Sequence, residues 1–130
     1  MQIHSNQMLQ ITNLRFYQKL EVAFCRDVPD FADLDSGTRH DFLGKCIGTG
    51  KAKGLLTEQG VAAYALGVWW LGENFEERSS SLLALLRGDF PEVRKVYAMN
   101  EWIGALISSP DDIATADEAL KQGYDRSCAW

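Results

Sequence analysis

The chain has few of the residues that build catalytic and metal sites. Its two histidines are His4 and His40, and its three cysteines are odd in number and widely spaced. Such cysteines are typical of reduced thiols and not of a disulfide framework, and none stands at a metal-ligand spacing. From the residues alone we expect no identifiable catalytic residue, no cofactor and no metal ion.

The chain also lacks a block of basic residues. Thirteen Lys and Arg are outnumbered by eighteen Asp and Glu, which gives a formal net charge of −5. A nucleic-acid-binding surface needs a basic stripe that releases counterions from phosphates, so we expect no nucleic-acid partner. Mild acidity suits a basic protein partner, and it also keeps many domains soluble.

No hydrophobic run is long enough to cross a membrane. The most apolar run, Val61–Leu71, has eleven residues without a charge, whereas a bilayer demands about 20. Residues Met1–Asn6 show no basic run followed by an apolar core, so we expect no signal peptide. The prediction is a cytoplasmic protein with no membrane association.

The periodicity of the sequence favours an all-α fold, because no useful length alternates with period two. The apolar run predicts a central helix at about 57–72 that is buried on nearly every side. Thr57 is placed to cap its first turn, and Gly72 to follow its last residue. We predict a compact single-domain bundle of five or six helices around this central helix.

Apolar spacing and helix-start signals predict the other helices. One spans about 7–25, and a second begins near Ser36, where Gly44 and Gly48 predict close approach by a neighbouring helix. A short helix follows Ser79, and another core helix begins near residue 91 and reaches 107.

A last helix restarts at 109–112 and should end at Gly123. We therefore predict a helical core domain over residues 1–107, with a C-terminal helix and tail over 108–130 packed on the same domain. The glycine-rich stretch 44–52 is not a phosphate-binding loop, since Lys45 and Ala52 stand where that motif requires Gly and Ser or Thr.

The end of the central helix is the candidate partner-binding region. Adjacent helical residues are about 100° apart, so two neighbouring tryptophans cannot face one crevice. Tryptophan is enriched at interface hot spots, although a helix packed on several sides would bury both. The acidic residues that follow indicate a charged rim for a partner, with a solvated loop or a cation site as alternatives. The predicted partner-binding residues are Trp69, Trp70, Glu73, Asn74, Glu76 and Glu77.

Two short motifs carry a family resemblance. They are Gly54-Leu55-Leu56-Thr57-Glu58 and Leu71-Gly72-x-x-Phe75, set in an order of apolar positions that runs from Ile3 to Ile103. In this order the chain resembles a group of small bacterial helical proteins encoded near type VI secretion system spike and effector genes. It departs from them at Gly60, where they carry an acidic or polar residue, and at Asn74, where aspartate is common.

The resemblance implies a secretion-associated accessory protein and no reaction. We expect a non-enzymatic protein that binds a secreted effector or spike component, as an effector immunity protein or as an effector chaperone or adaptor. One alternative is a small cytoplasmic enzyme whose site is assembled by the fold from Cys46, His40 or the glutamates around Glu76. Another is a structural or regulatory homodimer that buries one of the tryptophans.

Overall fold

The computed structural model describes residues 14–127, and this part of the chain is helical with no strand. The all-α prediction is confirmed, and six α-helices and two short 3-10 helices make up the described range. In chain order they are α2 (Leu14–Asp27), η1 (Phe31–Asp33), α3 (Ser36–Ala52), α4 (Glu58–Leu71), η2 (Phe75–Arg78), α5 (Ser80–Arg87), α6 (Glu92–Ser108) and α7 (Ile113–Ser127).

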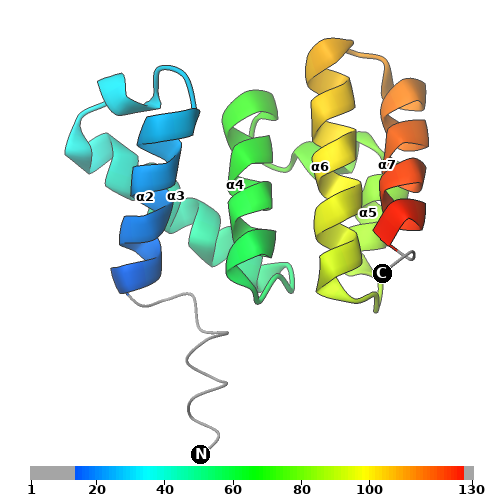
Figure 1. Ribbon diagram of the computed structural model, residues 1–130, viewed down its shortest axis with the longest axis horizontal. Helices are drawn as coiled ribbons and strands as arrows, with labels where there is room; N and C mark the ends of the chain where they lie inside the picture. The colour runs from blue at the N-terminus through cyan, green and yellow to red at the C-terminus, as the bar shows by residue number, and fades with distance from the viewer. Residues whose placement is uncertain (1–13, 128–130) are drawn as a thin grey trace, which may run out of the picture.

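The helices form two layers. In Figure 1, α2, α4, α6 and α7 stand side by side, while α3 crosses behind α2 and α4 and α5 lies behind α6 and α7. Helix α4 is central as predicted, since it packs against both α3 and α6. Val61, Tyr64 and Ala65 of α4 are fully buried in the core.

Burial of α4 on nearly every side is not what the structure shows. Ala62 and Leu66 are half-buried and Trp70 is 44% exposed. The reason is that α2 packs mainly against α3, which leaves one face of α4 uncovered. A helix without a charged residue between Val61 and Leu71 therefore presents an apolar face at the surface.

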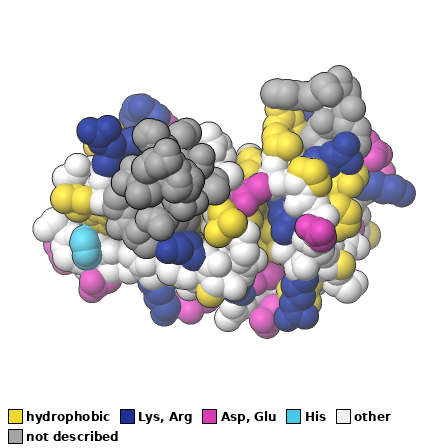
Figure 2. Space-filling view, turned by 90° about the horizontal axis from the view of Figure 1, so that it is seen from below, with side chains coloured by type: hydrophobic (Ala, Val, Ile, Leu, Met, Phe, Trp, Pro, Cys, Tyr) yellow, Lys and Arg dark blue, Asp and Glu magenta, His cyan; other side chains and the backbone are white. Residues whose placement is uncertain are grey.

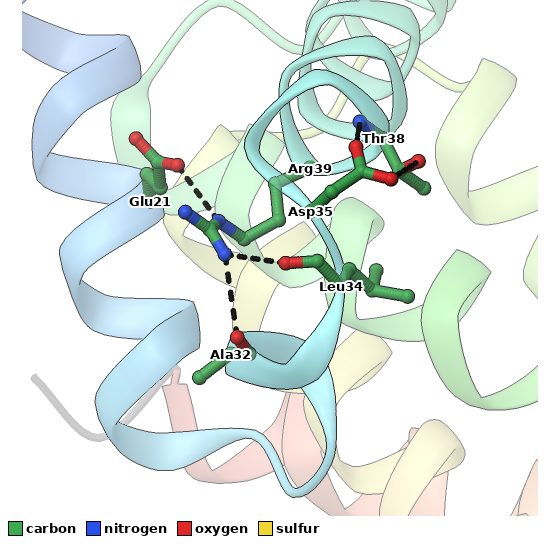
Figure 3. Close-up of polar contacts among 6 residues, drawn as sticks. All are labelled: Glu21, Ala32, Leu34, Asp35, Thr38 and Arg39. Atoms are coloured by element: carbon green, nitrogen blue, oxygen red, sulfur yellow. Dashed lines mark hydrogen bonds and ion pairs between the residues drawn. The ribbon is translucent and has the colours of Figure 1, made fainter.

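The corner between α2 and α3 is fixed by Arg39 (Figure 3). Its guanidinium donates to the Glu21 carboxylate at 2.9 Å and to the backbone carbonyls of Leu34 at 2.6 Å and Ala32 at 3.3 Å. The five donors of a guanidinium in a rigid fork allow one side chain to hold a helix and a turn together. Asp35 caps α3, since its carboxylate accepts from the Thr38 N–H at 2.7 Å.

The start of α4 is capped twice. The Thr57 hydroxyl accepts from the Gly60 N–H at 3.0 Å, as predicted. The Glu92 carboxylate, from the first residue of α6, accepts from the backbone N–H groups of Leu56 at 3.0 Å and Thr57 at 2.8 Å, and also from the Thr57 hydroxyl. A Cβ at position 60 would overlap this carboxylate, so Gly60 makes room for it.

The glycine predictions are partly wrong. Gly44 and Gly48 face open space, where a Cβ would meet nothing within 4 Å. Close contacts occur instead at Gly50, where a Cβ would lie 3.3 Å from Val61, and at Gly67, where it would enter the ring of Phe75. The spacing of glycines four apart thus did not identify the face that α3 turns toward its neighbour.

Helix α7 packs along α6 and does not end at Gly123. It continues to Ser127, and Gly123 lies inside the helix where a Cβ would sit 2.8 Å from the backbone oxygen of Tyr97. Gly123 therefore permits close packing of two helices. The predicted first helix is confirmed over 14–25 and extends to Asp27, while its residues 7–13 lie outside the described residues.

Candidate functional site

The two candidate tryptophans lie in different environments. Trp69 is half-buried, and its ring packs edge-on against Phe31 at 5.3 Å and Phe42 at 5.5 Å between centroids. Trp70 is exposed. The prediction that the two rings cannot face one crevice is confirmed, and Trp70 is the one available to a partner.

The acidic residues after α4 do not form one exposed rim. Glu73 is exposed and pairs with Lys45 at 2.8 Å, and Glu77 is exposed. Glu76 is only 1% exposed, which corrects the view of this segment as a uniformly solvated loop. Asn74 adopts a left-handed conformation with φ of 58°, and this bend turns the chain into η2.

Glu76 belongs to a buried polar network. Its carboxylate accepts from the Tyr64 hydroxyl at 3.1 Å and pairs with the ammonium of Lys53. Lys53 also donates to the Asn74 side-chain oxygen at 3.0 Å. Burial, and then the Glu76 carboxylate, raise the pKa of Tyr64 above its usual range. The network joins the end of α3, α4 and η2, so Glu76 and Asn74 have internal partners in this structure.

An apolar groove lies over the uncovered face of α4. Its volume is about 380 Å³, and α2 and α6 form its walls. Figure 2 shows the outline of the molecule indented between the half with α2 and α4 and the half with α6 and α7. Residues that line the groove include Leu20, Phe24, Ala62, Leu66, Val96 and Asn100.

The helix faces that line the groove extend past its ends. Residues three, four or seven positions apart share one helix face. Trp70 follows Leu66 by four positions, Val93 precedes Val96 by three, and Ile107 follows Asn100 by seven. Trp70, Val93 and Ile107 are among the exposed large hydrophobic residues of the described chain. The apolar surface on α4 and α6 is therefore longer than the groove itself.

The groove was not predicted from the sequence. Leu20 and Phe24, which line it from α2, are also buried residues of the core. The sequence signal that could have pointed to the groove is the excess of apolar residues on α4, because one stripe of that helix exceeds what its neighbours cover. That signal does not identify which helices flank the stripe.

Cys46 and His40, the residues of the alternative enzyme site, both pack against other side chains. Cys46 is 3% exposed, and its burial raises the pKa of the thiol to about 12, so the thiol is protonated near neutral pH. The ring of His40 packs edge-on against Tyr17 at 4.7 Å. His4 and Cys128 lie outside the described residues.

Within residues 14–127, no group of three or more His, Cys, Asp or Glu side chains is placed to hold a metal ion. No helix there combines the length and the apolar character that a membrane span requires.

Comparisons of the whole chain return no relative. No protein-family model, no curated protein and no solved structure matches it.

Proposed function

We propose that this chain binds another protein through the groove between α2, α4 and α6. One observation carries the proposal: the most apolar helix of the chain leaves a stripe uncovered at Ala62, Leu66 and Trp70. Contiguous exposed apolar surface that is edged by polar groups is typical of interaction sites. The edge here is polar, because Gln59 and Asn100 also line the groove.

The occupant that fits this groove is an amphipathic helix of the partner. The stripe on α4 from Gln59 to Trp70 spans eleven residue steps, or roughly 16 Å at 1.5 Å per residue, which is about three helical turns. A helix that places apolar side chains at positions i, i+3 or i+4, and i+7 covers such a length. Exposed Trp70 would act as an anchor at one end.

The partner proposed on the resemblance is a secreted effector or a spike component of a type VI secretion system. In this proposal the chain has no enzymatic role, is cytoplasmic, and acts as an immunity protein or as an effector chaperone or adaptor. An immunity protein of this kind would neutralise a toxin that acts in the cytoplasm.

Co-expression of the chain with effector candidates encoded next to its own gene tests the proposal. The expected result is co-purification of one candidate with the chain, and rescue of growth if that candidate is toxic. Ala62→Arg, which places a long charged side chain in the groove, should abolish co-purification.

Val22→Arg is the matched control, because Val22 is an exposed apolar residue of α2 that does not line the groove. It should leave co-purification intact. If no candidate co-purifies, or if both arginine variants bind equally well, the groove is not the binding site.

A further inference from the structure

A second cavity, larger than the groove, lies at the end of α3. Its volume is about 650 Å³, and it is bounded by the end of α3, by η2, by the end of α5 and by the first turn of α6. Cavities of roughly 300 to 1,000 Å³ are the size that holds small molecules. Both charged and apolar side chains line it, and the apolar ones include Leu83 and Leu86.

Lys95 is the buried cation of this cavity. It is 7% exposed, and its ammonium donates to the Leu86 carbonyl at 3.0 Å. Within the described residues it has no carboxylate partner. The carbonyls at the end of α5 supply about half a negative charge through the helix dipole, which compensates the ammonium only in part. An ammonium has three hydrogen-bond donors and the Leu86 carbonyl accepts from one, so this buried group can still bind an anion.

Arg87 is the second available cation. It lines the same cavity and is exposed, and it makes no hydrogen bond or ion pair with any described residue. The third cation, Lys53, is already occupied by Glu76 and Asn74. Lys95 and Arg87, from two helices, are therefore the cations of this cavity that no carboxylate of the described residues neutralises.

The acidic residues at this cavity limit what the anion carries. Three carboxylates line the cavity. Glu76 is paired with Lys53, whereas Glu77 and Asp89 are exposed and form no ion pair within the described residues. Carboxylates accept hydrogen bonds, so the best ligand pairs an anionic head with hydroxyl donors. A guanidinium and an ammonium both suit phosphate or carboxylate heads.

We propose that this cavity binds a small organic anion, with its phosphate or carboxylate at Lys95 and Arg87 and its hydroxyl groups toward Glu77 and Asp89. The site is separate from the protein-binding groove and does not depend on it. Binding stabilises the folded chain, since a ligand that binds only the native state raises its melting temperature.

Calorimetry and thermal shift with glucose 6-phosphate, gluconate and glucose test this assignment. Glucose 6-phosphate or gluconate should bind at millimolar concentration or below and raise the melting temperature, while glucose should do neither. Comparison of the two anions identifies the head group that the site prefers. Arg87→Ala should weaken binding by about tenfold, the effect of one charge-assisted hydrogen bond.

Two further variants keep the test decisive. Lys95→Met keeps most of the apolar stem of the side chain but removes the ammonium, and it should also weaken binding. Arg15→Ala removes an exposed arginine of α2 and should not weaken it. Because Arg87 is exposed, its variant tests the site even if Lys95→Met fails to fold. The proposal is overturned if neither anion binds, if glucose binds as well as they do, or if Arg87→Ala and Arg15→Ala bind alike.

Discussion

Removal of the Glu92 carboxylate should destabilise the start of α4 and reverse the effect of a substitution at Gly60. Glu92→Ala leaves the Leu56 and Thr57 N–H groups and the Thr57 hydroxyl without their acceptor. Helix caps contribute about 0.5–2 kcal/mol and hydrogen bonds to a charged group about 1.5–3 kcal/mol. Because Glu92 is half-buried and water can reach the site, we expect a loss of about 2 kcal/mol.

Gly60→Ala should change the free energy of unfolding in opposite directions in the native chain and in the Glu92→Ala variant. In the native background a Cβ displaces the Glu92 carboxylate, so most of the capping energy is lost. Alanine also gains up to about 1 kcal/mol over glycine inside a helix. The net effect is a destabilisation of about 1 kcal/mol. With Glu92→Ala the carboxylate is gone and the Cβ lies 3.2 Å from the Thr57 hydroxyl oxygen, a contact that a small shift relieves. Gly60→Ala should then stabilise by up to about 1 kcal/mol.

Urea denaturation followed by circular dichroism measures the free energy of unfolding of the native chain, of Glu92→Ala, of Gly60→Ala and of the double variant. The expected coupling between the two positions is about 2 kcal/mol. Gly48→Ala is the control, because a Cβ there meets nothing within 4 Å, and its effect should be the same with and without Glu92. If Gly60→Ala changes the free energy of unfolding equally in both backgrounds, within about 0.5 kcal/mol, the reasoning about this cap is refuted.

Three more predictions concern the core and the buried polar network. Gly67→Ala should destabilise by about 1–3 kcal/mol through overpacking against Phe75, whereas Gly44→Ala should not destabilise, as urea denaturation will show. Lys53→Met should lower the free energy of unfolding by about 3 kcal/mol, because it leaves buried Glu76 without its cation. Lys45→Met breaks an exposed pair and should lower it by less than about 1 kcal/mol in the same assay. Equal losses would contradict a buried ion pair at Glu76. Cys46 should resist iodoacetamide at pH 8 in the folded chain and react in urea, because a thiol with a pKa of about 12 has roughly one part in ten thousand as thiolate; fast labelling of the folded chain, located by peptide mapping, would show otherwise.

Local signals predicted the helices well because they act over one or two turns. The Thr57 hydroxyl accepts a hydrogen bond from the N–H of Gly60, which is three residues away. Gly72 has a positive φ of 98° directly after α4. Both features depend on the residue type at one position next to a helix end, and the sequence shows that residue type directly. The all-α class followed from the same short-range periodicity.

Features that depend on contacts between distant residues were not predicted. Glu92 caps α4 from 35 positions away from Thr57, and no spacing rule connects them. Glu76 stands among polar residues and looked solvated, yet η2 folds it onto Lys53 and Tyr64, which are 23 and 12 positions away. The cap also accounts for Gly60, since a Cβ at this position would overlap the Glu92 carboxylate.

In the candidate site too, local features were predicted and features that depend on distant contacts were not. The sequence predicted a partner-binding region at the end of α4, and Trp70 is exposed there. It did not reveal the groove, because the groove depends on how far α2 stands from α4, and that distance is set by the packing of α2 on α3. An apolar helix predicts burial but does not say whether its own chain or a partner provides the cover.

Hydroxyl-radical footprinting of the chain, alone and bound to the partner that co-purifies with it, shows whether the groove between α2, α4 and α6 is the surface that the partner covers. Side-chain oxidation at Trp70, Leu66 and Val96 should fall on binding, because these residues lie along the groove and its extension. Oxidation at exposed Val22, outside the groove, should be unchanged. Unchanged oxidation along the groove, with protection at Val22 or elsewhere, would contradict the assignment of this surface as the partner-binding site.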